Sequence, residues 1–258
     1  MAFTQELKKK AVDVGFVSVG VSDPGSLRGL PHGKIHSLYT LCSPEEQLSS
    51  VRSVVLLAFY AWDKAFNIQV DTAYLQDVSV RSKLPHEGES YQLYYEVLKN
   101  KAWMIVDYLA KKGYESAYSL GLPLKTCAVK CGLGCQGKNT LLITPIYGPR
   151  VRLISVLTTA ELDVDEPFEE NICRDCEKCV VACPTKALEP YKLKINRCMT
   201  YSAENPLAED VAEDVKEQEK RLIQRPSLCS YVECSICLEA CPVGKLASQQ
   251  ASKKGSVV

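Results

Sequence analysis

Hydrophobic and polar residues follow two different periods along the first two thirds of the chain. Residues 5–14 place apolar side chains at helical spacing and stop before Gly15, and residues 16–21 form a short run of β-branched and small residues. Residues 51–60 contain the uninterrupted apolar run VVLLAFY. A run without polar alternation is typical of a strand covered on both faces. The pattern therefore predicts a helix, a short strand and a buried strand in this order.

A long amphipathic segment at residues 91–112 gives the clearest helix prediction. Gly113 follows it, and glycine is a common residue just past the end of a helix. Residues 150–159 alternate well enough to predict a third strand, and residues 207–224 form a polar helix candidate. Helices and strands mixed in this way predict an α/β fold. The apolar positions of the long segment are Leu93, Tyr94, Val97, Leu98, Met104, Ile105, Tyr108 and Leu109.

The acidic segment ELDVDEPFEE at residues 161–170 marks a change in composition. Two interpretations stay open for it, a solvated linker or a docking surface for an electron-transfer partner. Short cysteine-rich turns follow it, and the last residues are small and basic. We therefore expect an α/β cofactor and substrate domain at 1–165, a cysteine-rich domain at 166–245 and a flexible tail at 246–258.

Composition narrows the class of protein. The chain has 258 residues with 31 basic and 31 acidic side chains, which argues against a polyanion binder that works by bulk charge. Thirteen cysteines are present, and nine of them lie between Cys173 and Cys241. The N-terminal stretch has no signal-peptide pattern, and the longest apolar run is about half of a membrane span. We expect a cytoplasmic protein with no membrane partner, in which cysteines bind metal rather than form disulfides.

The cysteine spacing is specific for iron–sulfur clusters. The first motif has the two-cluster ferredoxin spacing, with two, two and three residues between ligands and a proline after the last. A shorter copy follows, which also ends on Cys-Pro. Structural zinc sites lack the final Cys-Pro, so two 4Fe–4S clusters are predicted. The first motif is Cys173, Cys176, Cys179, Cys183 and Pro184, and the second is Cys234, Cys237, Cys241 and Pro242.

In bacterial two-cluster ferredoxins, the fourth cysteine of a motif binds the other cluster. One cluster, here called cluster A, would then take Cys173, Cys176, Cys179 and Cys241. The second, cluster B, would take Cys183, Cys234, Cys237 and one further cysteine. A standard motif would place that ligand at Tyr231, so the spacing leaves Cys198 and Cys229 as candidates.

A glycine-rich stretch precedes these motifs. Residues 130–145 read KCGLGCQGKNTLLITP, and on their own they suit either a turn that opens a strand or a loop close to a ligand. Joined to the cluster motifs, they resemble the epoxyqueuosine reductases and the related reductive dehalogenases. The segments TTAELDVDEP at 158–167, RCMTY at 197–201 and GFVSVGV at 15–21 continue this resemblance in the same order. The resemblance covers most of the chain.

The resemblance implies a nitroreductase-like α/β (α+β) cofactor domain followed by a bacterial two-cluster ferredoxin-like domain. It implies an oxidoreductase in which low-potential electrons from a ferredoxin- or flavodoxin-type donor pass through two 4Fe–4S clusters to a cobalamin and a small-molecule substrate. It favours Cys198 as the last cluster ligand. The residues expected to line the corrinoid are Gly132, Leu133, Gly134, Gly137, Lys138 and Asn139, and those expected beside the substrate are Tyr118, Lys138 and Cys135.

Three departures from the family pattern affect the expected substrate. The family's acidic proton donor lies about fourteen positions before the glycine motif, where this chain has Tyr118, which is either a proton donor or a core side chain. The histidine of the family's DYH is absent from Leu93-Tyr94-Tyr95. The chain also ends just after the second motif, without the C-terminal helical-repeat region. Together with the zero net charge, this makes tRNA an unlikely partner.

Three further cysteines crowd the glycine-rich stretch. Cys127, Cys131 and Cys135 are spaced four residues apart, and the first two would share one face of a helix. They are either buried apolar fillers or a redox pair or third metal site. Two alternatives to the corrinoid-dependent reductase follow. One is an electron-transfer or reductive-activator protein without a substrate of its own, and the other is a protein with an extra cysteine-bound metal site in place of cobalamin.

Overall fold

The computed structural model describes residues 2–30, 33–35, 39–61, 68–71, 90–205, 208–227 and 230–245. Cys229 and the expected tail at 246–258 lie outside the described residues. None of the described helices is long and apolar enough to cross a membrane.

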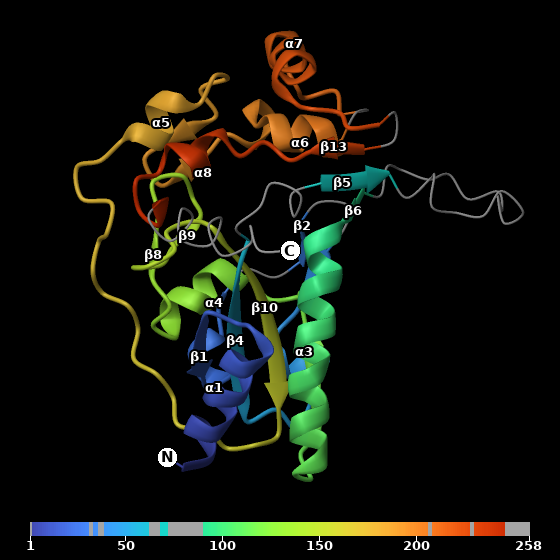
Figure 1. Cartoon of the computed structure of the whole chain (residues 1–258), viewed down its shortest axis with the longest axis vertical. Coiled ribbons are helices and arrows are strands. Elements are labelled where there is room, and N and C mark those ends of the chain that lie inside the picture. The colour runs from blue at the N-terminus through green and yellow to red at the C-terminus, as the bar shows by residue number, and fades with distance from the viewer. Residues whose placement is uncertain are drawn as a thin grey trace, which may run out of the picture.

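A four-stranded antiparallel sheet forms the lower half of the molecule (Figure 1). The strands at 16–21, 51–60 and 150–159 are confirmed, whereas the fourth was not predicted. All eight residues of the second strand are buried, which confirms that the sheet is covered on both faces. In spatial order, the strands are β1 (Ser18–Ser22), β4 (Ser53–Tyr60), β10 (Val151–Thr158) and β7 (Ser116–Ser119).

Helices cover the two faces of this sheet with separate hydrophobic cores. The α1 helix (Ala2–Val14) and the α3 helix (Leu93–Lys111) pack on one face, through side chains such as Leu57. On the other face, the α4 helix (Leu124–Lys130) and the turn after it pack through Leu56 and its neighbours. Both predicted N-terminal-half helices are confirmed. Neighbouring residues of β4 thus enter different cores, because side chains alternate along a strand.

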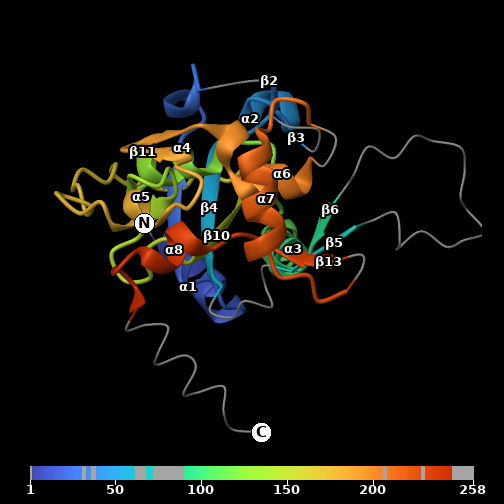
Figure 2. The ribbon, with the colours of Figure 1, turned by 90° about the horizontal axis from the view of Figure 1, so that it is seen from above.

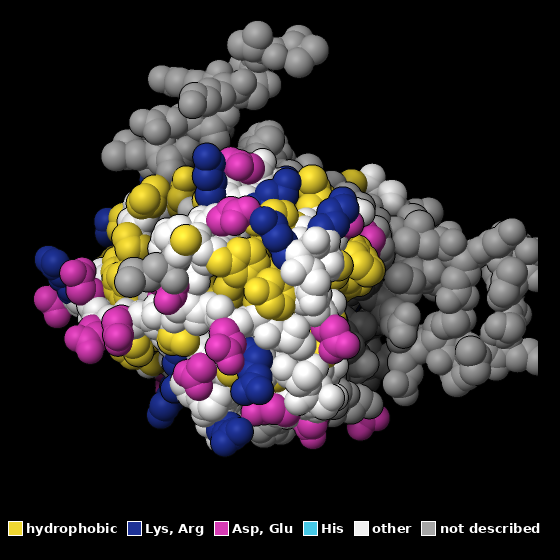
Figure 3. Space-filling model, turned by 90° about the horizontal axis from the view of Figure 1, so that it is seen from below, with side chains coloured by type: hydrophobic (Ala, Val, Ile, Leu, Met, Phe, Trp, Pro, Cys, Tyr) yellow, Lys and Arg dark blue, Asp and Glu magenta, His cyan; other side chains and the backbone are white. Residues whose placement is uncertain are grey.

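The lower face of the molecule carries charges of both signs. Figure 3 shows hydrophobic side chains gathered near the middle of this face, with basic and acidic side chains intermixed around them. On this face, acidic and basic side chains are therefore intermixed and are not separated into an acidic patch and a basic patch.

The cysteine-rich region lies above the upper end of the sheet, as the views in Figures 1 and 2 agree. Its elements are short, and its largest core contains only Met199, Val211, Val215, Ile223 and Tyr231 as buried members. The polar helix expected at 207–224 is confirmed over a shorter span, as α7. The elements are α5 (Lys178–Ala182), β11 (Leu188–Glu189), β12 (Lys192–Leu193), η5 (Ile195–Arg197), α6 (Met199–Glu204), α7 (Glu213–Leu222), β13 (Ser230–Val232) and α8 (Ile236–Ala240).

The two regions share backbone pairing. Strand β13 of the cysteine-rich region pairs with β5 (Ile68–Asp71), which pairs with β6 (Ser90–Gln92). The predicted boundary near residue 165 thus separates two stretches of sequence that meet again in a common sheet. The remaining elements are η1 (Gly25–Leu27), β2 (Gly33–Ile35), β3 (Tyr39–Leu41), α2 (Pro44–Gln47), β8 (Cys135–Gln136) and β9 (Leu142–Ile143).

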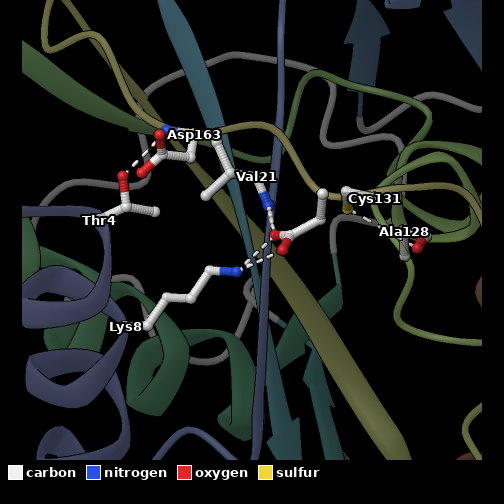
Figure 4. A network of polar contacts seen from close by, with 7 residues as sticks. Thr4, Lys8, Val21, Ala128, Cys131 and Asp163 are labelled. Carbon is white, nitrogen blue, oxygen red and sulfur yellow. Dashed lines mark hydrogen bonds and ion pairs between the residues drawn. The ribbon is translucent and has the colours of Figure 1, made fainter. Parts of the chain in front are cut away.

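The acidic segment at 161–170 is mostly exposed, and its middle is bonded to the edge strand β1. Asp165 and Val21 exchange two hydrogen bonds, from the Asp165 N–H to the Val21 carbonyl at 2.9 Å and from the Val21 N–H to the carboxylate at 2.8 Å. Lys8 forms an ion pair with the same carboxylate, and Thr4 accepts a hydrogen bond from the Asp163 N–H (Figure 4). Asp165 therefore satisfies both backbone groups of Val21 at the otherwise open β1 edge.

Candidate iron–sulfur and redox site

The four cysteines expected around cluster A lie near one another. Burial raises the pKa of the Cys179 thiol, and the neighbouring Cys173 and Cys241 thiols raise it further. Burial also raises the pKa of Cys241, which has Cys173 and Cys176 among its neighbours. Contact between α5 and α8 produces this arrangement, because the cysteines flank or lie within these short helices. The folding of the chain thus brings together thiols that are about 60 residues apart in sequence.

A second group of thiols surrounds Cys237. Burial raises the pKa of Cys237 to about 12, and the nearby Cys234, Cys198 and Cys183 thiols raise it in that order of effect. Burial raises the pKa of Cys234 to about 11, again with Cys198 and Cys183 as neighbours. Cys198 therefore belongs to the group that was expected to surround cluster B. A buried thiol must lose its proton to bind iron, so cluster assembly here would release protons.

The chemistry of the two groups fits clusters better than single ions. No set of three or more His, Cys, Asp or Glu residues in the described part of the chain is spaced to hold one metal ion. A 4Fe–4S cluster takes one thiolate on each iron, so its four ligands stand further apart than the ligands of zinc. Two groups of four thiols, with ligands exchanged between the motifs, suit a pair of such clusters.

The glycines before the first motif approach the protein's own backbone. A Cβ atom at Gly134 would lie 2.2 Å from the Ile143 carbonyl oxygen, and one at Gly132 would lie 2.7 Å from the Glu166 carbonyl oxygen. Gly132 also has a φ of 81°, which a side chain would disfavour. Contacts with strand β9 and with the acidic segment therefore explain both glycines. Leu133, between them, is buried in the core on the α4 face of the sheet.

Asn139 and Tyr60 each have a buried polar atom without a hydrogen-bond partner within the described residues. The Asn139 side-chain oxygen accepts a hydrogen bond from the Leu141 N–H at 3.2 Å, but its amide nitrogen has no partner. The buried Tyr60 hydroxyl has none either, although the ring packs 4.8 Å from that of Tyr147. Unpaired buried polar groups are costly and need an explanation. A polar ligand that meets Asn139 or Tyr60 would supply one.

Lys138 ties the glycine-rich stretch to the cluster A loop. It is only 8% exposed, and its ammonium lies 3.5 Å from the carboxylate of Glu177, between two expected cluster ligands. Its carbonyl accepts a hydrogen bond from the Tyr191 N–H at 3.2 Å. The side chain and the backbone of Lys138 therefore both connect the α/β region with the cluster region.

The three extra cysteines fall into two environments. Cys127 and Cys131 are buried in the core on the α4 face, and the Cys131 thiol donates to the Cys127 carbonyl at 3.1 Å. Burial raises the pKa of Cys127 to about 12, which disfavours the thiolate form. Cys135 instead packs with Ile143 and Cys241 beside the cluster A group. Of the three, Cys127 and Cys131 thus pack in the core on the α4 face, whereas Cys135 lies beside the candidate redox centre.

Tyr118 lies on the other side of the sheet. It packs against the core that α1 and α3 form, with the Trp103 ring 6.0 Å away in an edge-on contact. Leu133 and Cys131, by contrast, belong to the core on the α4 face. The structure does not bring Tyr118 together with Cys135 or Lys138. The environment of Tyr118 is that of a half-buried core side chain.

The sequence patterns missed two arginines that join the regions. Arg150 is buried and donates to the Val243 carbonyl at 2.6 Å and to the Cys241 carbonyl at 3.2 Å. Arg152 forms a 2.8 Å ion pair with Glu233, the residue before Cys234. The only sequence signal for these two arginines was their charge, because they lie at the start of a strand whose other residues are mostly apolar. Both arginines hold segments that carry expected cluster ligands.

Comparisons with known proteins agree with this architecture. Residues 172–244 match the 4Fe-4S double cluster binding domain family. The chain is 26% identical to an epoxyqueuosine reductase from Prochlorococcus marinus, over 93% of this chain and 77% of that protein. It is 39% identical to a tetrachloroethene reductive dehalogenase from Dehalobacter restrictus, over 47% of this chain and 23% of that protein. The similarity to the reductase is thus weaker per residue but much more extensive.

The fold is shared with solved structures. An epoxyqueuosine reductase from Bacillus subtilis superposes with a TM-score of 0.67 at 21% identity, over 95% of this chain and 66% of that one. The chain thus spans about two thirds of that reductase. With its mixed α/β fold and its double cluster domain, the chain is an iron–sulfur oxidoreductase. Within that class it is a relative of the epoxyqueuosine reductases and the reductive dehalogenases.

The expectation that tRNA is an unlikely partner is wrong. An epoxyqueuosine reductase that matches 95% of this chain with a TM-score of 0.67 has been solved with an epoxyqueuosine-modified tRNA stem loop. The matched part of that reductase therefore shares its fold with this chain. A net charge of zero describes the whole chain and does not exclude a local site for an anionic partner.

Proposed function

We propose that the chain is a reductase of the epoxyqueuosine type, with epoxyqueuosine in a tRNA stem loop as its substrate. One observation carries this proposal. The match to the epoxyqueuosine reductases extends over 93% and 98% of this chain in two relatives, whereas the match to the dehalogenases covers 47%. The cysteine usage suits a reducing, cytoplasmic compartment.

Two 4Fe–4S clusters would supply low-potential electrons. Cluster A is assigned to Cys173, Cys176, Cys179 and Cys241, and cluster B to Cys183, Cys198, Cys234 and Cys237. The grouping of the buried thiols supports both assignments. Arg150 holds the carbonyls of Cys241 and Val243, and so keeps the last cluster A ligand against the α/β region.

A corrinoid, when bound in a nitroreductase-like α/β domain, would supply low-valent cobalt for the reduction. The Asn139 amide and the Tyr60 hydroxyl, both buried without a partner, are the groups that would bind its polar edge. Lys138 is assigned to position the glycine-rich stretch against cluster A through Glu177. Cys135 is assigned to the boundary between the two sites, next to Cys241. Gly132, Gly134 and Gly137 would shape the backbone of this stretch.

Anaerobic reconstitution tests the proposal in two stages. Iron analysis should give about eight irons per chain in the wild type and in Cys229→Ser, but about four in Cys198→Ser, because two clusters hold four irons each. Eight irons in Cys198→Ser would remove Cys198 from cluster B. Cobalamin should then bind with a change in its absorbance spectrum, more weakly in Asn139→Leu. A flat titration with the wild type would rule out the corrinoid.

Turnover is tested with a stem loop that carries epoxyqueuosine. Reduced wild-type protein loaded with cobalamin should convert the modified nucleoside, as followed by mass spectrometry of the digested RNA. Loaded protein that binds both cofactors but leaves the nucleoside unchanged would refute the assigned substrate.

A second candidate is an electron-transfer or activator protein without a substrate of its own. The position of Tyr118 favours it, because the residue at the expected proton-donor position packs behind the sheet. Reduced protein would then pass its electrons to a partner and show no turnover of the stem loop. Turnover by the isolated, reduced protein would exclude this candidate.

A further inference from the structure

The hairpin between the two Cys-Pro motifs exposes an apolar surface. Residues 189–196, which include the end of β11 and all of β12, are all exposed. Tyr191, Leu193 and Ile195 are 39%, 39% and 42% exposed. They make up three of the ten large hydrophobic side chains that are exposed in the described residues. Three exposed apolar side chains within five residues offer a candidate contact for a partner.

Basic residues alternate with these apolar residues along the hairpin. Between residues 186 and 197 the chain has four basic residues and one acidic residue. Lys194 pairs with Glu189 at 2.6 Å and Arg197 pairs with Asp214 at 2.6 Å. Lys186 and Lys192 are exposed and form no ion pair within the described residues, although Glu189 lies near Lys192 as well as Lys194. The hairpin therefore carries exposed apolar side chains interspersed with basic ones, and an excess of positive charge.

The hairpin is attached directly to the cluster B group. Its backbone runs from Cys183 to Cys198, both assigned as ligands. The Ala187 N–H donates to the Cys183 sulfur at 3.3 Å, and the Cys198 N–H donates to the Ile195 carbonyl at 2.9 Å. The two arms are joined by a hydrogen bond from the Lys194 N–H to the Ala187 carbonyl at 2.8 Å. A protein bound on this hairpin would lie close to cluster B.

The tip of the hairpin is held in place. Tyr191 follows Pro190 and has a φ of 65°, which costs a bulky residue about 1–3 kcal/mol. Contacts outside the hairpin compensate for this cost. The Tyr191 N–H binds the Lys138 carbonyl, and its hydroxyl lies 3.1 Å from the Asn171 amide nitrogen. The apolar surface is therefore presented as a fixed shape, which reduces the entropy lost on binding.

We propose that the hairpin at 186–197 is the docking site for the electron donor, a small acidic one-electron carrier of the ferredoxin or flavodoxin type. The reduced carrier would lose one electron and the oxidised cluster B would gain it, with no bond made or broken. Electron tunnelling slows steeply with distance, and a carrier bound on the hairpin would lie beside the segment that joins two of the assigned cluster B ligands. Charge complementarity raises the association rate of such short-lived complexes. The proposal rests on the cluster B assignment made above.

Charge argues against the acidic segment at 161–170 as the docking site for an acidic carrier. It carries six acidic residues and no basic one, so it would repel an acidic carrier. Its Asp165 is also bonded to the β1 edge and to Lys8.

Stopped-flow reduction of the reconstituted protein by a pre-reduced acidic ferredoxin tests the site. Lys186→Glu/Lys192→Glu should lower the second-order rate constant at least tenfold at low salt and weaken its dependence on ionic strength. Leu193→Ser should lower the rate without changing that dependence. The control Lys9→Glu/Lys220→Glu makes the same change in charge at exposed positions elsewhere and should keep the wild-type rate.

Further measurements separate the outcomes. Iron content and reduction by dithionite should match the wild type in every variant, which shows that the clusters are intact. Equal rates with ferredoxin in the wild type and in the hairpin double variant would overturn the docking site. If the double variant instead weakens binding of the stem loop and leaves ferredoxin reduction unchanged, the hairpin binds RNA and the proposal is wrong. Absence of clusters in the wild type would refute the proposed function itself.

Discussion

The sheet region and the cluster region are built on different principles. The sheet buries every residue of β4 and fills a hydrophobic core on each face. The cluster region has short elements, with five residues in each of α5 and α8, and a small core. Helices of this length do not persist alone in water. Packing therefore stabilises the first region, whereas eight thiols bound to iron would stabilise the second.

Iron removal should give the largest difference between the two regions. Chelation of iron from the reconstituted protein should expose the amides of 172–244 to hydrogen exchange, and leave those of β4 and β10 protected. Strand β5 should lose protection together with its partner β13. Peptide-level mass spectrometry of hydrogen exchange, before and after chelation, measures this. Equal loss of protection in both regions would show that they unfold as one unit.

A cavity in the core of the sheet region should destabilise that region and leave the cluster region intact, which is the reverse of iron removal. Leu57 is fully buried, so Leu57→Ala should lower the free energy of unfolding of the sheet by about 3–5 kcal/mol. Iron content under native conditions should not change, because Leu57 contacts no expected ligand. Denaturant unfolding followed by far-UV circular dichroism gives the first quantity. Val12→Ala, at a 55% exposed position, is the control and should change stability by less than about 0.5 kcal/mol.

The Arg152–Glu233 pair tests how firmly the regions are joined. Both side chains are 17% exposed, and the guanidinium also lies 4.5 Å above the Tyr94 ring. Glu233→Ala would leave the buried cation without its carboxylate, at a cost of about 2–3 kcal/mol, since partial exposure reduces the penalty of a fully buried pair. Faster exchange at β13 and β5 should accompany this loss. An unchanged exchange rate there would mean that the Arg152–Glu233 pair does not hold β13 and β5 in place.

The same division explains what the sequence could predict. Strand β4, helix α3 and the cysteine motifs are encoded by neighbouring residues, so period and spacing predict them. The face on which Tyr118 lies depends on the pairing of β7 with β10, which no local pattern specifies. The partners of Arg150 and Gly134 are distant carbonyls, and a charge or a glycine gives no sign of which backbone it meets. Elements and motifs that depend on neighbouring residues could therefore be predicted from the sequence, whereas contacts between residues far apart in the chain could not.

Removal of the Lys8–Asp165 ion pair should give the smallest change in the free energy of unfolding. It tests whether the acidic segment belongs to the sheet region or to the cluster region. The side chains are 20% and 32% exposed, so the ion pair is partly screened by solvent. Asp165→Asn retains an acceptor for the Val21 N–H but removes the charge, and should cost about 1 kcal/mol in the unfolding of the sheet. Glu166→Gln, at an exposed neighbour without an ion pair in the described residues, should cost less than about 0.5 kcal/mol. Because Asp165 contacts α1 and β1, hydrogen exchange should rise at 161–168 while iron content stays constant. Loss of iron in Asp165→Asn would instead assign the acidic segment to the cluster region.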